Sequence, residues 1–481
     1  MTATTHSIAA RLESFIGSPS NFQDSVDPGF YAIEGAVPSA VAKPASAAEA
    51  AEIVRFAAKE KLAVIPTGAH TKLSIGARPS RYDIALDMCA LRQIAHYDPA
   101  DLTVSVDAGM TIAAVNAALL EHNQFLPLLV PYYSQSTIGG AIASGIDSPL
   151  RNAYGTARDF LLGAEFIDGT GALVKSGGRV VKNVSGYDLH KLLIGSLGTL
   201  AIITRLNFRT FPVPLTPRGF LASFPTHEAA LLARQKIAES PLTPLTLDVT
   251  DPGAARIFAE RTPSSPEPGI FSGGSHTAAD SALPVPGTWF HPNDWQLCAA
   301  FAGVPEVLDR YVRELTRIAE QHGAATISIL DDTTRPSIWG RLREALPLFR
   351  ESSPAAVILQ LNVLPSRQTQ AITILKSVAS AALLPLALVA RASGALYIAL
   401  LPESAQSDAA AISLLTQEIF SLSRSFDGRA SLLFAPPAVK DLLQSALNSH
   451  PHSDLALMRR IKSAFDPNST FAPNRLFSDS L

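Results

Sequence analysis

The stretch VIPTGAHTKLSIG, residues 64–76, begins in an apolar segment and continues into a turn of small and turn-forming residues. Residues 62–65 are apolar, which is typical of a short buried β-strand. Around Gly68 the backbone N–H groups are unblocked, and such groups can bind an anion. One imidazole, His70, lies in the middle of the turn. The stretch therefore predicts a loop at the end of a strand, either a plain tight turn or an anion-binding loop.

A second stretch of the same kind is PYYSQSTIGGAIASG, residues 131–145, and we predict a second small-residue loop there. Either loop alone is explained equally well as a tight turn, but two in one domain favour a shared anion such as a diphosphate. No G-x-G-x-x-G follows a strand, and no G-x-x-x-x-G-K-[ST] occurs in the chain. These absences disfavour a Rossmann or P-loop nucleotide site.

Length and composition limit the class of protein. The 481 residues exceed what one hydrophobic core usually holds, about 250–300 residues, so two domains are expected. A net charge of −3 and the lack of basic runs argue against a nucleic-acid partner. Cys89 and Cys298 are too few for an iron–sulfur cluster or a four-thiolate zinc site, and we expect reduced structural thiols.

Two segments bear on location. The N-terminus has no basic head followed by an apolar run, so no secretory signal is expected. The most apolar segment, residues 378–402, is interrupted by Pro385 and Arg391 and is too short to cross a bilayer. The sequence therefore predicts a cytoplasmic protein without a transmembrane segment.

Local patterns predict helices and strands along the whole chain. Ser46 and Glu49 have the spacing of a capping box before an amphipathic helix, and Thr111 is expected to cap another helix. Residues 160–181 alternate around a DGTG turn as a β-hairpin does. Residues 251–292 are rich in Pro, Ser and Gly, which predicts a surface excursion or a mobile lid. A basic helix ended by Pro467 and followed by a tail closes the chain.

Three segments resemble, in order, the FAD-binding domain of the vanillyl-alcohol oxidase and p-cresol methylhydroxylase (PCMH) flavoproteins. They are VIPTGAHTKLSIG (64–76), STIGGAIASG (136–145) and RNAYGTARDFLLGAEFIDGTGALVKSGGRVVKNVSGYDLHKLLIGSLGTLAIIT (151–204). Within that superfamily, KNVSGYDLHKLLIGSLGTL (182–200) and RRIKSAFDPNSTFAPNRLF (459–477) are most similar to the FAD-binding E subunit of bacterial glycolate dehydrogenase (glycolate oxidase). Several separated motifs in the family's order are more specific than one loop.

The resemblance implies an α+β fold with FAD as cofactor. A PCMH-type FAD-binding domain of two subdomains is expected over residues 1–215, and a cap or substrate domain with an antiparallel sheet and helices over residues 216–450. Residues 451–481 are expected to return to the FAD domain. The residues that the resemblance assigns to FAD lie in the two loops and near a later strand: Pro66, Thr67, Gly68, Ala69, His70, Thr71, Lys72, Ser136, Thr137, Ile138, Gly139, Gly140, Ser144, Gly198 and Ile203.

Three positions depart from the pattern of the nearest relatives. In berberine-bridge-type members a histidine at the position of His70 bonds covalently to the flavin, whereas glycolate-dehydrogenase-like chains usually carry a small residue there. His70 is therefore expected either to bind the flavin covalently or to lie beside the cofactor without a bond. Leu197 replaces a frequent acidic residue, and Ala472 replaces an Asn that often reaches the flavin, so contacts near the ring are expected to differ.

The catalytic and metal-binding residues are less well determined by the sequence. No closely spaced histidine cluster of the kind seen in the family's catalytic subunits occurs, and His450 and His452 are expected in a solvated loop, so we predict no metal. In the cap, Arg391 and Tyr397 are weak substrate candidates, because an arginine can clamp a carboxylate. Trp339, Arg341 and Arg343 form a further cluster, in which the two arginines are expected on a solvated helix face.

The resemblance implies three alternative functions. The first is an FAD-linked dehydrogenase component that oxidises a small 2-hydroxy acid, such as glycolate or D-lactate, by hydride transfer to the flavin. The second is an FAD-binding electron-relay or assembly subunit without substrate oxidation of its own. The third is a free-standing flavin oxidase of an alcohol or sugar. For the first, the expected partners are a second flavoprotein subunit and an iron–sulfur subunit, through which the chain would lie peripherally on the inner membrane.

Overall fold

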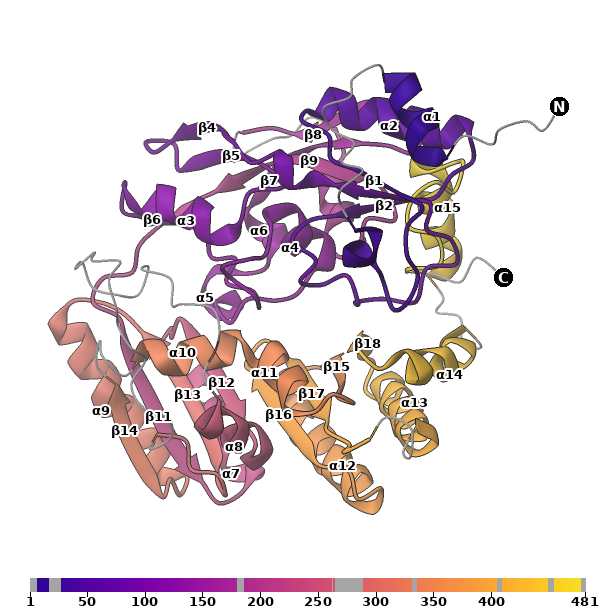
Figure 1. Ribbon diagram of the computed structural model, residues 1–481. Helices are drawn as coiled ribbons and strands as arrows, with labels where there is room; N and C mark the ends of the chain where they lie inside the picture. Colours follow the sequence, from indigo (N-terminus) through magenta and orange to yellow (C-terminus); the bar gives the residue numbers. More distant parts are fainter. Residues whose placement is uncertain are drawn as a thin grey trace.

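The computed structural model divides the chain into two halves that pack against each other (Figure 1). The first half holds three small sheets, and the second holds one large sheet. The structure describes residues 7–16, 27–179, 186–261, 263, 289–330, 335–404, 409–448 and 454–476. Both halves contain helices together with sheets whose strands are mainly antiparallel. The α+β fold expected from the sequence is therefore confirmed.

The first half combines a parallel three-stranded sheet, in the order β1-β3-β2, with an antiparallel five-stranded sheet, in the order β4-β5-β9-β7-β8. Strands β10 and β6 form a short antiparallel pair. The elements of this half are α1 (Ile8–Ile16), η2 (Pro28–Tyr31), β1 (Ala40–Ala42), α2 (Ala47–Lys59), β2 (Val64–Thr67), β3 (Ile84–Asp87), η3 (Met88–Ala90), β4 (Ile94–Asp98), β5 (Thr103–Asp107), α3 (Ile112–Leu120), β6 (Gln124–Phe125), α4 (Ile138–Ser144), α5 (Arg151–Tyr154), α6 (Ala157–Phe160), β7 (Leu161–Ile167), β8 (Leu173–Gly177), η4 (Leu189–Leu193), β9 (Ile202–Arg209) and β10 (Phe211–Pro212).

Local signals in the sequence account for several of these elements. The Ser46 side chain accepts a hydrogen bond from the Glu49 N–H, which satisfies a free donor at the start of α2. Thr111 caps α3 in the same way through the Ala114 N–H. The hairpin predicted around DGTG is strands β7 and β8. These three expectations are confirmed.

The second half, which we call the cap, contains one antiparallel sheet in the order β14-β11-β13-β12-β16-β17-β15-β18. Its elements are β11 (Arg218–Phe224), α7 (His227–Glu239), β12 (Thr246–Thr250), α8 (Pro252–Glu260), β13 (Trp295–Phe301), α9 (Pro305–Gln321), β14 (Thr326–Leu330), α10 (Arg335–Arg343), α11 (Ala345–Ser352), β15 (Val357–Asn362), η6 (Pro365–Arg367), α12 (Gln368–Ala381), β16 (Leu386–Arg391), β17 (Ala395–Leu400), α13 (Ala409–Ser425), β18 (Arg429–Phe434) and α14 (Pro437–Asn448).

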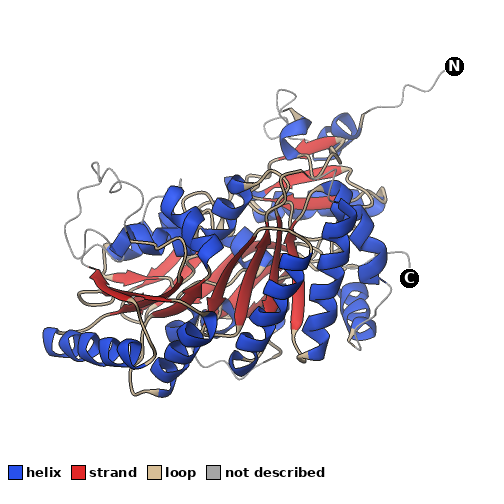
Figure 2. Ribbon diagram, turned by 90° about the horizontal axis from the view of Figure 1, so that it is seen from below, coloured by secondary structure: helices blue, strands red, loops and turns tan. Residues whose placement is uncertain are grey.

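The two faces of the cap sheet have different neighbours. In β13, Trp295, Leu297 and Phe301 point to one face and pack with α7, α9, α12 and α13. Figure 2 shows helices that lie along the strands of the large sheet. Cys298 points to the other face, the inner one, which packs with α8, α10 and α11. Ile75 from the first half belongs to this second cluster. The inner face of the cap therefore lies toward the first half of the chain.

The end of the chain returns to the first half. Helix α15 (Leu455–Phe465) packs there through Phe465, whose ring stacks on Phe166 with centroids 6.0 Å apart. Beyond it, Phe471 forms a parallel bridge with Val64 of β2. The C-terminal segment thus lies beside the strand that leads into the first loop (Figure 1).

The structure corrects two expectations about loops. Residues 138–144, expected to be part of a loop, form α4, which Thr137 caps at its start and Gly145, with a φ of 65°, ends. The Pro-, Ser- and Gly-rich stretch 251–292 begins with helix α8, because Asp251 caps it and Pro252 is tolerated at its first position. Most of the remaining stretch lies outside the described residues. No helix in the described ranges is long and apolar enough to span a membrane.

Candidate functional site

An open cavity lies between the two predicted loops and the segment before β9. It contains about 810 Å³ of space, a volume that includes open solvent at its mouth. All the residues that the resemblance assigned to FAD line it except Ser136 and Ile138. Leu197, where altered contacts near the ring were expected, also lines it. Further lining residues were not identified from the sequence as FAD-binding: Ile65, Leu73, Met88, Ala108, Ala143, Ala201 and Arg475.

The first loop is close to the second, and glycine makes this approach possible. A β-carbon added at Gly68 would lie 2.4 Å from Thr137 Oγ1, the atom that caps α4. A β-carbon added at Gly198 would lie 2.6 Å from Pro66 Cγ. The cavity walls therefore meet through bare backbone, which allows a ligand to contact main-chain groups directly.

His70 has a left-handed backbone conformation, with φ 60°, which normally favours glycine. Its ring lies 4.6 Å, centroid to centroid, from each of the rings of Phe30 and Tyr31. Burial lowers the pKa of this imidazole, so the ring is neutral at pH 7. Tilted and edge-on packing against two aromatic rings explains why a histidine is tolerated in this turn. The covalent bond to the flavin and a position beside the cofactor without a bond both stay predictions.

The second loop presents the start of α4 to the cavity. Gly139 is packed against the residue that follows β5, since a β-carbon there would lie 2.8 Å from that of Ala108. Ser144 lines the cavity and donates a hydrogen bond to the Ala141 carbonyl. Ile138 is instead part of the hydrophobic core of this half. The wall is thus made of small side chains supported by a fixed backbone.

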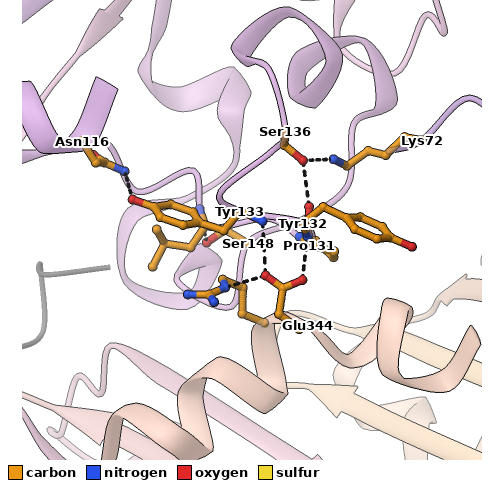
Figure 3. A network of polar contacts seen from close by, with 10 residues as sticks. Lys72, Asn116, Pro131, Tyr132, Tyr133, Ser136, Ser148 and Glu344 are labelled. Atoms are coloured by element: carbon orange, nitrogen blue, oxygen red, sulfur yellow. Dashed lines mark hydrogen bonds and ion pairs between the residues drawn. The ribbon is translucent and has the colours of Figure 1, made fainter. Parts of the chain in front are cut away.

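Lys72 links the two loops. Its Nζ donates to Ser136 Oγ (Figure 3). The same Nζ donates, at 3.2 Å, to Thr71 Oγ1. Burial lowers the pKa of Lys72 to about 7, and the negative charge of Glu344 opposes this shift. Ser136 therefore acts on the cavity through Lys72 and does not line it.

The C-terminal segment contributes a cation. Arg475 is buried, lines the cavity and donates through its guanidinium to the carbonyls of Leu73 and Ala77. Burial lowers its pKa to about 10, so it is charged at neutral pH. Ala472, at the position where relatives often carry an Asn that reaches the flavin, packs in a small core with Tyr82. The FAPNR motif was noticed in the sequence for its alanine, but its arginine is the residue that reaches the cavity.

Arg391 and Tyr397 do not line this cavity. They lie on neighbouring strands of the cap sheet, with the Arg391 guanidinium 5.1 Å from the centre of the Tyr397 ring. Arg391 forms a buried ion pair with Asp248 at 3.0 Å. The hydroxyl of Tyr397 is buried and has no hydrogen-bond partner in the described part of the chain. Their role toward a substrate stays a prediction.

The expectation of a solvated face for Arg341 and Arg343 is wrong. Both side chains are 3% exposed, because α10 lies between the cap sheet and the first half. Arg341 donates to the Phe258 carbonyl, and Arg343 contacts Glu344 and the ring of Tyr133. Trp339 is buried nearby.

The remaining predictions concern the two cysteines and a metal site. Cys89 and Cys298 are free thiols, and burial raises the pKa of Cys89 to about 12. Within the described ranges, no group of His, Cys, Asp and Glu could hold a metal ion. His450 and His452 lie outside the described residues.

The cavity suits a long anionic ligand with an apolar part. Its ionisable lining residues are Lys72, Arg475 and His70, and no carboxylate lines it among the described residues. The glycines of the two loops expose main-chain atoms to the cavity, and the side chains of Met88, Leu73 and Leu197 form its apolar surface. Such a lining fits a dinucleotide with a diphosphate and a flat ring system.

Comparison with known families agrees with this assignment. Residues 38–177 match the FAD binding domain, and residues 218–428 and 446–476 match the C-terminal domain of FAD linked oxidases. The fold and cavity thus define a flavoprotein with a PCMH-type FAD-binding domain. The chain belongs to the FAD-linked oxidases, and its cofactor is FAD.

Curated relatives cover the chain only in part. The glycolate oxidase subunit GlcE of Escherichia coli (strain K12) is 34% identical over 41% of this chain and 55% of its own length. The glycolate oxidase subunit GlcD of Bacillus subtilis (strain 168) is 29% identical over 49% and 52%. The D-2-hydroxyglutarate dehydrogenase of Xanthomonas citri pv. viticola is 32% identical over 40% and 41%. The chain therefore spans about half the length of the curated relatives that it matches.

Solved structures share the fold over nearly the whole chain. p-Cresol methylhydroxylase with substrate bound superposes with a TM-score of 0.73 at 17% identity, covering 97% of this chain and 95% of that one. The 4-ethylphenol oxidase of Gulosibacter chungangensis has a TM-score of 0.71 at 14% identity, with 98% and 97% covered. At such low identity these similarities establish the fold alone.

Proposed function

We propose that this chain oxidises a small 2-hydroxy acid, such as glycolate or D-lactate, with FAD as the hydride acceptor. The relatives named above include glycolate oxidase subunits and a D-2-hydroxyglutarate dehydrogenase, which supports this substrate class. The observation that carries the proposal is the cavity between the two loops, whose lining contains the basic side chains of Lys72 and Arg475 and no described carboxylate.

In this proposal the FAD diphosphate binds mainly to backbone N–H groups of the first loop. In the second loop only Thr137 and Gly140 are proposed as donors, because the N–H groups of the neighbouring residues already donate to carbonyls of the chain. Lys72, which contacts Ser136 in the other loop, supplies positive charge to the same region. When bound, FAD supplies the redox chemistry by accepting a hydride from the carbon that carries the hydroxyl group. The contribution of the chain is to bind and orient the cofactor and to exclude water from it.

The inner face of the cap is the proposed substrate side. Arg391 and Tyr397 are candidates there, because an arginine can bind a carboxylate and the Tyr397 hydroxyl lacks a partner in the described structure. Asp248 already neutralises the Arg391 guanidinium, so a substrate carboxylate would compete with an internal partner. This competition makes Arg391 a weak candidate.

We also propose the domain division 1–215, 216–450 and 451–481. The start of the cap sheet at β11 and the bridge between Phe471 and Val64 support it. As a component of a glycolate-dehydrogenase-type complex, the chain would pass electrons to an iron–sulfur subunit or a quinone, beside a second flavoprotein subunit. The complex would hold the chain peripherally at the inner membrane.

The test is anaerobic mixing of the purified, FAD-loaded chain with glycolate or D-lactate. Loss of the oxidised flavin absorbance is the expected result. A loaded chain whose flavin neither acid reduces would contradict the proposal and favour the relay or assembly subunit, which the subunit relatives support. Hydrogen peroxide production from an alcohol or sugar in air would instead indicate the free-standing oxidase.

A further inference from the structure

The cap contacts both loops of the cavity through buried charged side chains. At the first loop the contact is Lys440, on α14, whose side chain is 4% exposed. Its Nζ donates to the carbonyls of Ser74 and Gly76 and forms an ion pair with Glu34. A cation of the cap thus binds the end of the first loop.

The same stretch is held from another direction by Arg475, which donates to the carbonyls of Leu73, Ile75 and Ala77. The successive carbonyls from Leu73 to Ala77 therefore accept hydrogen bonds alternately from Arg475 and Lys440. Neither cation comes from a neighbouring part of the sequence. The conformation of this part of the loop consequently depends on α14 and on the C-terminal segment.

At the second loop the contact is Glu344, between α10 and α11, which is 2% exposed. Its carboxylate accepts hydrogen bonds from the N–H groups of Tyr132 at 2.6 Å and Tyr133 at 3.2 Å (Figure 3). Tyr132 has a left-handed φ of 59°, and its carbonyl in turn accepts from the Ser136 N–H at 2.7 Å. Glu344 therefore fixes the turn from which Ser136 reaches Lys72.

We propose that Lys440 and Glu344 are positioning residues through which docking of the cap and binding of FAD are thermodynamically coupled. The inference rests on the proposed position of FAD between the two loops. Neither residue lines the cavity, so any effect on FAD must pass through the loops.

The physical reason is the cost of ordering the loops. A loop held by buried charges is already in its binding conformation, whereas a released loop must be ordered when FAD binds, which weakens affinity. Coupling is reciprocal, so FAD must stabilise the docked cap by the same factor.

The first test compares FAD dissociation constants, measured by quenching of flavin fluorescence. Lys440→Met is expected to weaken binding about 5- to 150-fold, the usual range of coupling between sites, and Lys440→Arg to restore most of it. Lys236→Met, which removes an exposed cap cation paired with Glu239, is the control and should bind FAD as the wild type does. Glu344→Gln is expected to weaken binding, with Glu239→Gln as its control.

The second test measures backbone hydrogen exchange of the wild-type chain with and without FAD. FAD is expected to slow exchange in α11 and α14, neither of which lines the cavity. Because this measurement uses the wild-type chain, it tests the coupling between FAD and the cap even where a variant fails to fold. Unchanged exchange in both helices, or wild-type affinity in folded Lys440→Met and Glu344→Gln, would overturn the inference. A wild-type chain that takes up no FAD would instead refute the proposed site.

Discussion

At the scale of single residues, the ionisable groups of the cavity determine how FAD binding depends on pH. Burial lowers the pKa of Lys72 to about 7, below the ordinary lysine value of 10.5. This lysine therefore destabilises the free chain most below pH 7 and progressively less as the pH rises toward 10.5. An anion in the same cavity raises the pKa again, so FAD binding above pH 7 requires uptake of a proton.

The first prediction follows from this linkage. FAD affinity of the wild type should fall as the pH rises above 7, by at most about tenfold per pH unit for one proton. Lys72→Met should bind FAD more weakly at pH 6 and show a flatter pH dependence. Titrations of FAD from pH 6 to 9 check this, and equal slopes for both chains would contradict it.

His70 gives a second prediction at this scale. Because its ring already packs against the rings of Phe30 and Tyr31, we expect FAD to be held without a covalent bond. Acid precipitation of the loaded protein should then leave the yellow colour in the supernatant. Colour that stays in the pellet, and is lost in His70→Ala, would demonstrate the histidyl bond instead.

At the scale of elements, the close contact between α4 and β5 gives a third prediction. Gly139→Ala places a methyl group 2.8 Å from the β-carbon of Ala108, so overpacking should destabilise the chain by about 1–3 kcal/mol. The variant should also bind FAD more weakly, because α4 lines the cavity. Chemical denaturation measures the loss. Gly178→Ala, where an added β-carbon meets no atom within 4 Å, should change neither quantity.

The elements also show how far local sequence signals extend. Caps such as Ser46 and Thr111, and the DGTG turn, act within a few residues, so their helices and hairpin were predictable. Helix α4 was missed because Gly139 and Gly140 have low helix propensity, and tertiary packing overrides that preference. The cavity loops could be located from their glycines together with the family resemblance.

At the scale of the whole molecule, the contacts between the cap and the first half could not be predicted. Glu344 contacts residues more than 200 positions earlier, and Lys440 contacts residues more than 360 positions earlier. No periodicity in the sequence encodes such pairs. Arg341 and Arg343 were misjudged for the same reason, since the first half covers the helix that carries them.

A prediction at this scale concerns thermal stability. FAD should raise the unfolding temperature, because a ligand that binds only the folded chain stabilises it by about 2.7 kcal/mol at a hundredfold excess over its dissociation constant. If the coupling through Lys440 holds, Lys440→Met should show a smaller rise at the same FAD concentration. Calorimetric scans of both chains, with and without FAD, check this, and equal rises would contradict it.

The central claim is that two separate glycine-bearing loops hold the diphosphate of FAD. A crystal structure of the FAD-loaded chain measures this most directly. The account predicts diphosphate oxygens within hydrogen-bond distance of backbone N–H groups in residues 67–72 and of the N–H group of Thr137 or Gly140 in the second loop. Diphosphate bound elsewhere on the chain, with these loops free of it, would contradict the account.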